Sequence, residues 1–130
     1  MEISVNFGEN RVVEAEIGGH VVKTDQKVED GGDGSAPSPS QYFLASIAAC
    51  AGFYVMQFCR QRDIPTEGVS VTMRATRNEK TRLLDPVTIE IKLPPDFPAR
   101  YEPAVVRAAD QCWVKKQIQA GMECETKTVR

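Results

Sequence analysis

The feature that most restricts the fold is a long segment without any charged side chain, which runs from residue 35 to residue 59. At its start, Ser38, Pro39 and Gln41 match the N-cap, the first helical residue and the capping-box partner of a helix. No turn signal interrupts the chain before Arg62, and a helix of that length spans about 30 Å. A helix that is uncharged on all sides is expected to lie buried at the centre of a structure.

The same segment is close to the length of a membrane span. Its Ser46, its Gln57 and its many alanines argue against that interpretation, as do the strand-like sequences on both sides. We therefore expect no membrane partner and a helix that is covered by protein.

Apolar residues alternate with polar ones before the central helix, through residues 3–22, with glycine turns near Gly8 and Gly18. This pattern predicts a three-stranded antiparallel meander. Residues 29–39 are rich in glycine and proline and lack the spacing of a phosphate-binding loop, so they are expected to form a connecting loop.

The sequence after the central helix predicts a hairpin followed by two short helices. Alternation in residues 69–75 and 87–93 predicts the two strands of the hairpin. Pro103 is placed to open the next helix, and Asp110 is expected to be the N-cap of another that ends before Gly121. Together with the meander, these elements predict an α+β fold.

Length and charge narrow the classes of function. The 130 residues suit a single domain, here residues 1–130, and the net charge of −2 gives no basic patch for nucleic acid. The first residues are acidic where a signal peptide would be basic and apolar, so a reducing cytoplasm is the expected location. We expect no nucleic-acid partner and no cofactor.

Four cysteines are the candidate reactive groups: Cys50, Cys59, Cys112 and Cys124. They form no C-x-x-C pair, and the single histidine, His20, is distant from all of them in sequence, so no metal site is expected. Cys50 and Cys59 would lie on opposite sides of the central helix, about 13 Å apart along its axis, and could not bridge each other.

The other thiols have different expected surroundings. Cys112 falls in the expected first turn of a short helix, where the positive end of the helix dipole and the nearby Lys115 and Lys116 favour a thiolate. Cys59 lies on a stripe of small residues and is expected to pack. Residues 123–129 alternate as an edge strand, in which Cys124 is also expected to pack. His20 is expected at the surface, and Trp113 in the core or at an interface.

Two stretches of this sequence resemble a known superfamily. The first comprises Gly18-Gly19-His20, Gly31-Gly32 and the run from Ser38 to Cys50, and the second runs from Ala109 to Val114. Both resemble the OsmC/Ohr superfamily, named for osmotically inducible protein C and organic hydroperoxide resistance protein. The resemblance covers essentially the whole chain, and two cysteine motifs in the same order make it fairly specific.

The resemblance implies an OsmC-like intertwined homodimer, with antiparallel sheets wrapped around two long central helices. It also implies thiol peroxidase activity toward organic hydroperoxides. Cys50 would attack the peroxide and become a sulfenic acid, Cys112 would condense with it to a disulfide, and an external dithiol would reduce that disulfide. Aromatic residues such as Phe43, Phe53 and Tyr54 would favour alkyl substrates.

The sequence departs from the superfamily pattern at one position beside the first cysteine motif. Ser40 stands where active members carry a glutamate that holds an activating arginine. Arg11 is the residue nearest to the Ohr-type arginine position and is the candidate for that role. Without such a cation, burial alone would raise the pKa of the Cys50 thiol. Two alternatives to the enzyme follow: a non-enzymatic dimer that binds a small apolar ligand or senses redox state, and a purely structural dimer.

Overall fold

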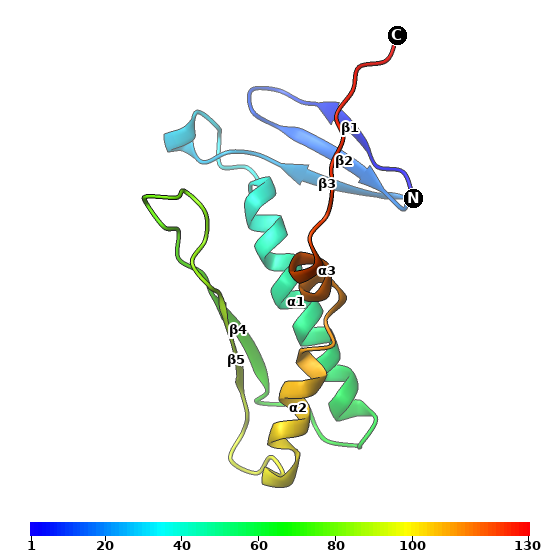
Figure 1. Cartoon of the computed structure of the whole chain (residues 1–130), viewed down its shortest axis with the longest axis vertical. Coiled ribbons are helices and arrows are strands. Elements are labelled where there is room, and N and C mark those ends of the chain that lie inside the picture. The colour runs from blue at the N-terminus through cyan, green and yellow to red at the C-terminus, as the bar shows by residue number, and fades with distance from the viewer. The chain divides into compact units, whose positions relative to one another are not determined.

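A computed structural model describes all 130 residues and divides them into two compact units, Met1–Ala45 and Ser46–Arg130. Three α-helices and two small antiparallel sheets make up the chain (Figure 1). The expected α+β class is therefore confirmed. The long helix α1, Pro39–Arg60, contributes its first turns to the first unit and the remainder to the second.

The first unit contains the predicted meander. Strands β1 (Ser4–Phe7), β2 (Val13–Ile17) and β3 (His20–Thr24) pair in sequential antiparallel order. Gly18 and Gly19 join β2 to β3, both with positive φ, which side chains other than glycine rarely adopt. A single turn of 3-10 helix, η1 (Val28–Asp30), follows.

A buried aspartate organises the glycine-rich loop, which the sequence predicts only as a connection. The Asp25 carboxylate is fully buried and accepts hydrogen bonds from the Gln26 N–H at 2.7 Å and from the Ser35 N–H and hydroxyl at 2.9 and 2.6 Å. The Ser35 hydroxyl is the main cause that lowers the pKa of Asp25 to about 2. Gly32 is required nearby, because a Cβ there would lie 2.0 Å from the Gln26 carbonyl oxygen.

Helix α1 begins as its sequence predicts. The Ser38 hydroxyl accepts the Gln41 N–H at 3.4 Å, and the Gln41 side chain accepts the Ser38 N–H at 2.9 Å, which completes the capping box. Only one stripe of the helix is buried within the chain, formed by Ile47, Ala51, Val55, Phe58 and Cys59. The expectation of burial on all sides is therefore wrong for the single chain.

The core of the second unit forms where α1 meets the hairpin and the next helix. Strands β4 (Ser70–Arg74) and β5 (Thr88–Lys92) pair in the predicted antiparallel hairpin. The turn η2 (Ala99–Tyr101) leads into α2 (Glu102–Ala109), with Pro103 in its first turn as predicted. Buried side chains of α1 and α2 pack together with the inward side chains of both strands. Figure 1 shows the ribbons of α1, α2 and this hairpin next to one another.

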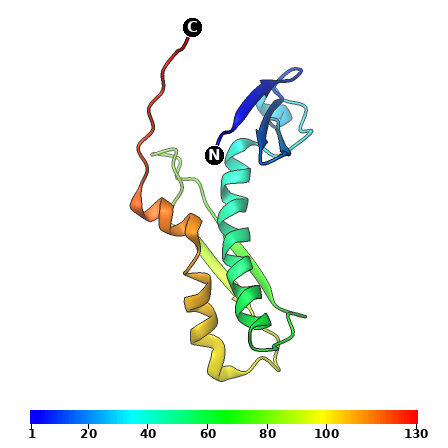
Figure 2. The ribbon, with the colours of Figure 1, turned by 90° about the vertical axis from the view of Figure 1, so that its right-hand side faces the viewer.

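Two C-terminal predictions need correction. Helix α3 (Trp113–Ala120) is capped by Cys112, not by Asp110, whose helical backbone belongs to the end of α2. Residues 121–130 form no strand, because their backbone finds no neighbouring strand to pair with, and all of them are exposed. Figure 2 shows this tail as extended chain leaving α3.

Helix α1 is also long and apolar enough to cross a membrane when judged by length and composition alone. The core helix of a soluble protein passes the same test. Since α1 carries the main buried stripe of the second unit, its apolar character has an explanation within the protein fold.

Candidate active site: two thiols at the start of α3

Cys50 and Cys112 are distant in sequence but lie close enough in the structure for the Cys112 thiol to lower the Cys50 pKa through a hydrogen bond. Cys50 lies midway along α1 and is partly exposed, whereas Cys112 is fully buried between α2 and α3. The structure thus brings together the two cysteines that sequence analysis paired through a resemblance. An accessible thiol can react with a dissolved oxidant. A buried thiol beside it can then react with the oxidised sulfur to form a disulfide.

The remaining cysteines lie elsewhere. Cys59 is fully buried in the core of the second unit, as expected for a packing residue. Cys124 is exposed in the C-terminal tail, so the prediction that it packs in a strand is wrong. All four thiols are free.

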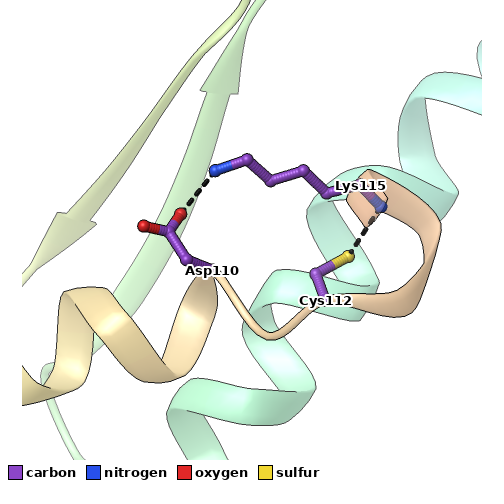
Figure 3. Close-up of polar contacts among 3 residues, drawn as sticks. All are labelled: Asp110, Cys112 and Lys115. Carbon is purple, nitrogen blue, oxygen red and sulfur yellow. Dashed lines mark hydrogen bonds and ion pairs between the residues drawn. The ribbon is translucent and has the colours of Figure 1, made fainter. Parts of the chain in front are cut away.

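The first turn of α3 directs its free backbone N–H groups at the two sulfur atoms. Lys115 donates its N–H to the Cys112 Sγ at 3.4 Å (Figure 3). Hydrogen bonds from the Val114 and Trp113 N–H groups lower the pKa of Cys50. The first N–H groups of any helix lack partners within the helix and carry its positive dipole end. The Cys50 and Cys112 sulfur atoms therefore take the place of the serine or aspartate side chain that usually accepts hydrogen bonds from the first N–H groups of a helix.

This arrangement favours a thiolate at Cys50. Burial is the largest single influence on the Cys50 pKa and raises it. The hydrogen bonds from the Cys112 thiol and from the Val114 and Trp113 N–H groups outweigh burial, so the Cys50 pKa lies below the ordinary thiol value. The direction is opposite to the rise expected for a Cys50 thiol without a cation beside it, because the N–H groups of α3 stabilise the thiolate.

The pKa of the buried Cys112 is shifted in the opposite direction. Burial is the main cause that raises the Cys112 pKa, and the neighbouring Cys50 raises it further through a hydrogen bond and through charge. The start of a helix favours a thiolate, but at Cys112 burial and the neighbouring Cys50 outweigh the Lys115 and Val114 N–H groups, which lower its pKa. This direction agrees with the resolving role that the resemblance implies for Cys112.

Aromatic side chains accompany Cys50 on its face of α1. Phe53 and Tyr54 lie three and four residues further along, which places them on the same side of the helix as Cys50. Their rings are 5.3 Å apart in an edge-to-face arrangement, and the Phe53 side chain is 50% exposed. Trp113 is 64% exposed, so of its two expected places the core is wrong, and an interface stays a prediction.

Arg11 belongs to the first unit, in the turn between β1 and β2, where its guanidinium lies close to Gly31. Ser40, in the first turn of α1, has its hydroxyl 3.1 Å from that of Ser38. A role for Arg11 in activating Cys50 stays a prediction.

The rate of Cys50 alkylation by iodoacetamide, followed by peptide mapping across pH, is expected to inflect below about 8.5, the ordinary thiol value. The lowered pKa also links Cys50 to folding. Its stabilising contribution is present above the pKa of the unfolded chain and is lost as pH falls through the folded pKa. The matched control is the same cysteine in guanidinium-denatured protein. An inflection no lower than that of the denatured control would contradict the argument.

The chain is similar to proteins of one known family, in sequence and in fold. The sequence profile of the family described as OsmC-like protein matches residues 32–127. No curated protein matches the sequence. Solved structures at about 20% identity match across most of the chain.

One of these structures, from Psychrobacter arcticus 273-4, is named for osmotic stress induction and a detoxification response. It is 21% identical, with a TM-score of 0.73 over 88% of this chain and 85% of its own. An organic hydroperoxide resistance protein OsmC from Legionella pneumophila is also 21% identical, with a TM-score of 0.56 and coverage of 88% and 85%. The Bacillus subtilis organic hydroperoxide resistance protein OhrB is 17% identical, with a TM-score of 0.53 and coverage of 88% and 87%. At this identity the structures establish a shared fold.

Proposed function

The chain belongs to the OsmC-like protein family, and from that premise we propose that it is a thiol-dependent peroxidase that reduces organic hydroperoxides. The observation that carries the proposal is the contact between a partly exposed Cys50 and a buried Cys112, with helix N–H groups directed at the former. The names of the Legionella and Bacillus structures agree with this class of substrate. No cofactor takes part in the cycle.

In the first step, the Cys50 thiolate attacks one oxygen of the peroxide. The sulfur–oxygen bond forms as the O–O bond breaks, the sulfur is oxidised to a sulfenic acid, and the organic half leaves as an alkoxide that takes a proton to become an alcohol. The lowered pKa of Cys50 keeps more of this thiol in its nucleophilic form. Phe53 and Tyr54 give an organic substituent apolar surface to approach.

In the second step, the Cys112 sulfur attacks the Cys50 sulfenic acid. A disulfide forms, and the hydroxyl of the sulfenic acid leaves as water with the proton of Cys112. While Cys50 is a thiolate it raises the Cys112 pKa. Oxidation removes that negative charge, so Cys112 becomes easier to deprotonate only after Cys50 has reacted. The two cysteines therefore react in a fixed order, Cys50 first and Cys112 second.

An external dithiol completes the cycle. Its thiolate attacks the disulfide, and its second thiol releases it from the mixed disulfide, which leaves both cysteines reduced and the dithiol oxidised. Cys50, the more accessible sulfur, is the expected point of attack. Such dithiols are kept reduced in the cytoplasm, where we place the protein.

The test is one equivalent of an organic hydroperoxide added to the reduced protein, with peptide mapping of all four cysteines. A disulfide between Cys50 and Cys112 within seconds is expected. Hydrogen peroxide at the same concentration is expected to react more slowly. Free thiols after prolonged exposure would exclude the peroxidase and favour a non-enzymatic role, which would be pursued by mass spectrometry of any apolar molecule that copurifies.

We also propose that the chain acts as a single OsmC-like domain that dimerises through α1. The small residues Ala48, Ala49 and Gly52 line an open groove of about 440 Å³ beside Val69 and Val71. A Cβ added at Gly52 would meet no atom within 4 Å. This unfilled face of α1, which carries no charge before Arg60, suits the close approach of α1 from a second copy.

The Gly52→Leu variant is expected to fold, because its side chain has room within one chain, but to sediment as a monomer where the wild type sediments as a dimer. Gly52→Ala is the matched control and should remain dimeric, since a methyl group still permits close approach. Analytical ultracentrifugation at micromolar concentration distinguishes the two. A monomeric wild type, or a Leu variant that dimerises as tightly as the wild type, would contradict the proposal.

A further inference from the structure

The corner between α2 and α3 determines where the N–H groups beside Cys50 point. Asp110 ends α2 with helical backbone angles, φ −70° and ψ −10°. Cys112 then departs from helical geometry with φ −47° and ψ 117°, and α3 begins at the next residue. Because so few residues form the corner, a small change in their backbone would redirect the first turn of α3.

Lys115 makes two interactions with this corner. Its backbone N–H donates to the Cys112 Sγ, and its side-chain ammonium forms an ion pair with the Asp110 carboxylate (Figure 3). The ion pair therefore connects the end of α2 to the first turn of α3, on either side of the buried thiol. The Lys115 side chain is 34% exposed and the Asp110 side chain 55%, so water partly screens the ion pair.

We infer that the ion pair between Lys115 and Asp110 holds the α2–α3 corner in the shape that directs the Trp113 and Val114 N–H groups at Cys50. Lys115 and Asp110 are thus positioning residues, since neither side chain touches a reacting sulfur. The inference rests on the proposed function only where it concerns disulfide formation.

We expect the ion pair to act on Cys50 through the backbone geometry of the first turn of α3. Hydrogen bonds and burial account for the shift of the Cys50 pKa, and the Lys115 ammonium is not among its causes. Loss of the ion pair would instead let the first turn of α3 rotate or fray. The Trp113 and Val114 N–H groups would then stabilise the Cys50 thiolate less well, and Cys112 would spend less time in contact with Cys50.

Lys115→Met and Asp110→Asn each remove the ion pair and keep most of the side-chain volume. Lys116→Met is the matched control, because Lys116 makes the same charge change on the same turn but binds the neutral Gln111 side chain at 3.0 Å. The pH profile of Cys50 alkylation in the full chain is the first measurement. Loss of the ion pair is expected to move the inflection up by about 0.2 to 0.7 pH unit, which is about 1.5- to 5-fold less thiolate at a fixed pH.

The double variant Lys115→Met/Asp110→Asn should shift no further than either single variant, since all three lack the same interaction. Lys115→Arg should restore the wild-type profile, because arginine can pair with Asp110. Circular dichroism confirms that each variant is folded. The inference is overturned if Lys115→Met and Asp110→Asn titrate like the wild type, or if Lys116→Met shifts Cys50 as much as they do.

A second measurement separates this inference from the proposed function. After one equivalent of organic hydroperoxide, dimedone traps the Cys50 sulfenic acid, and its yield is compared with that of the disulfide. Lys115→Met should give a several-fold higher ratio of trapped sulfenic acid to disulfide. If the wild type forms no disulfide but the alkylation profile still shifts in Lys115→Met, the peroxidase proposal fails and the positioning role stands. If the wild type forms the disulfide and Lys115→Met matches it in both measurements, the positioning role fails alone.

Discussion

Cys50→Ser is expected to abolish peroxide reduction, with the rate falling on the order of a thousand-fold or more. Serine keeps the size of the side chain, but its hydroxyl is not ionised near neutral pH and cannot become a sulfenic acid. The buried Cys112, with its raised pKa, is a poor substitute nucleophile. Consumption of an organic hydroperoxide in the presence of a dithiol measures the loss, and peptide mapping should find no oxidised cysteine at one equivalent.

Two further variants identify which step has been lost. Cys112→Ser should still consume one equivalent of hydroperoxide but stop at a Cys50 sulfenic acid that dimedone traps, because no thiol remains beside it. Cys124→Ser, in the exposed tail, is the control and should behave as the wild type. If Cys50→Ser retained the wild-type rate, the assignment of Cys50 as the attacking thiol would be wrong.

Val105→Ala is expected to lower the free energy of unfolding by about 2 kcal/mol, the largest stability change that we predict. Val105 lies on α2 and is fully buried in the cluster that also contains Val55 and Phe58 of α1. Removing two methyl groups there leaves a space that the packed neighbours fill only in part. Urea denaturation followed by circular dichroism measures the change, read from the midpoint at constant m-value.

The adjacent residue provides a matched control. Val106 is 52% exposed on the same helix, so Val106→Ala makes the same chemical change without opening the core. It should leave stability unchanged or raise it by a few tenths of a kcal/mol, since alanine favours a helix more than valine does. Equal losses of stability in both variants would contradict the assignment of the cost to core packing.

The sequence predicted most of the local structure because the relevant signals act over a few residues. The capping box at Ser38 and Gln41 locates the start of α1, and period-two alternation locates β4 and β5. The prediction of a strand in the C-terminal tail is wrong because strand formation depends on residues that are distant in the sequence. Alternation in residues 123–129 describes a segment able to join a sheet, but a strand exists only where a neighbour offers hydrogen bonds.

The sequence by itself determined the α+β class, the central helix and the two cysteine motifs, since periodicity, caps and motifs are all written in neighbouring residues. Tertiary structure alone decided which thiol carries the lowered pKa, because that depends on groups brought together from α1 and α3. It also decided that Cys112 caps α3 and that Asp110 pairs with Lys115. Desolvation and hydrogen bonding depend on the direction and distance of neighbours in space, and the order of residues along the chain does not specify either.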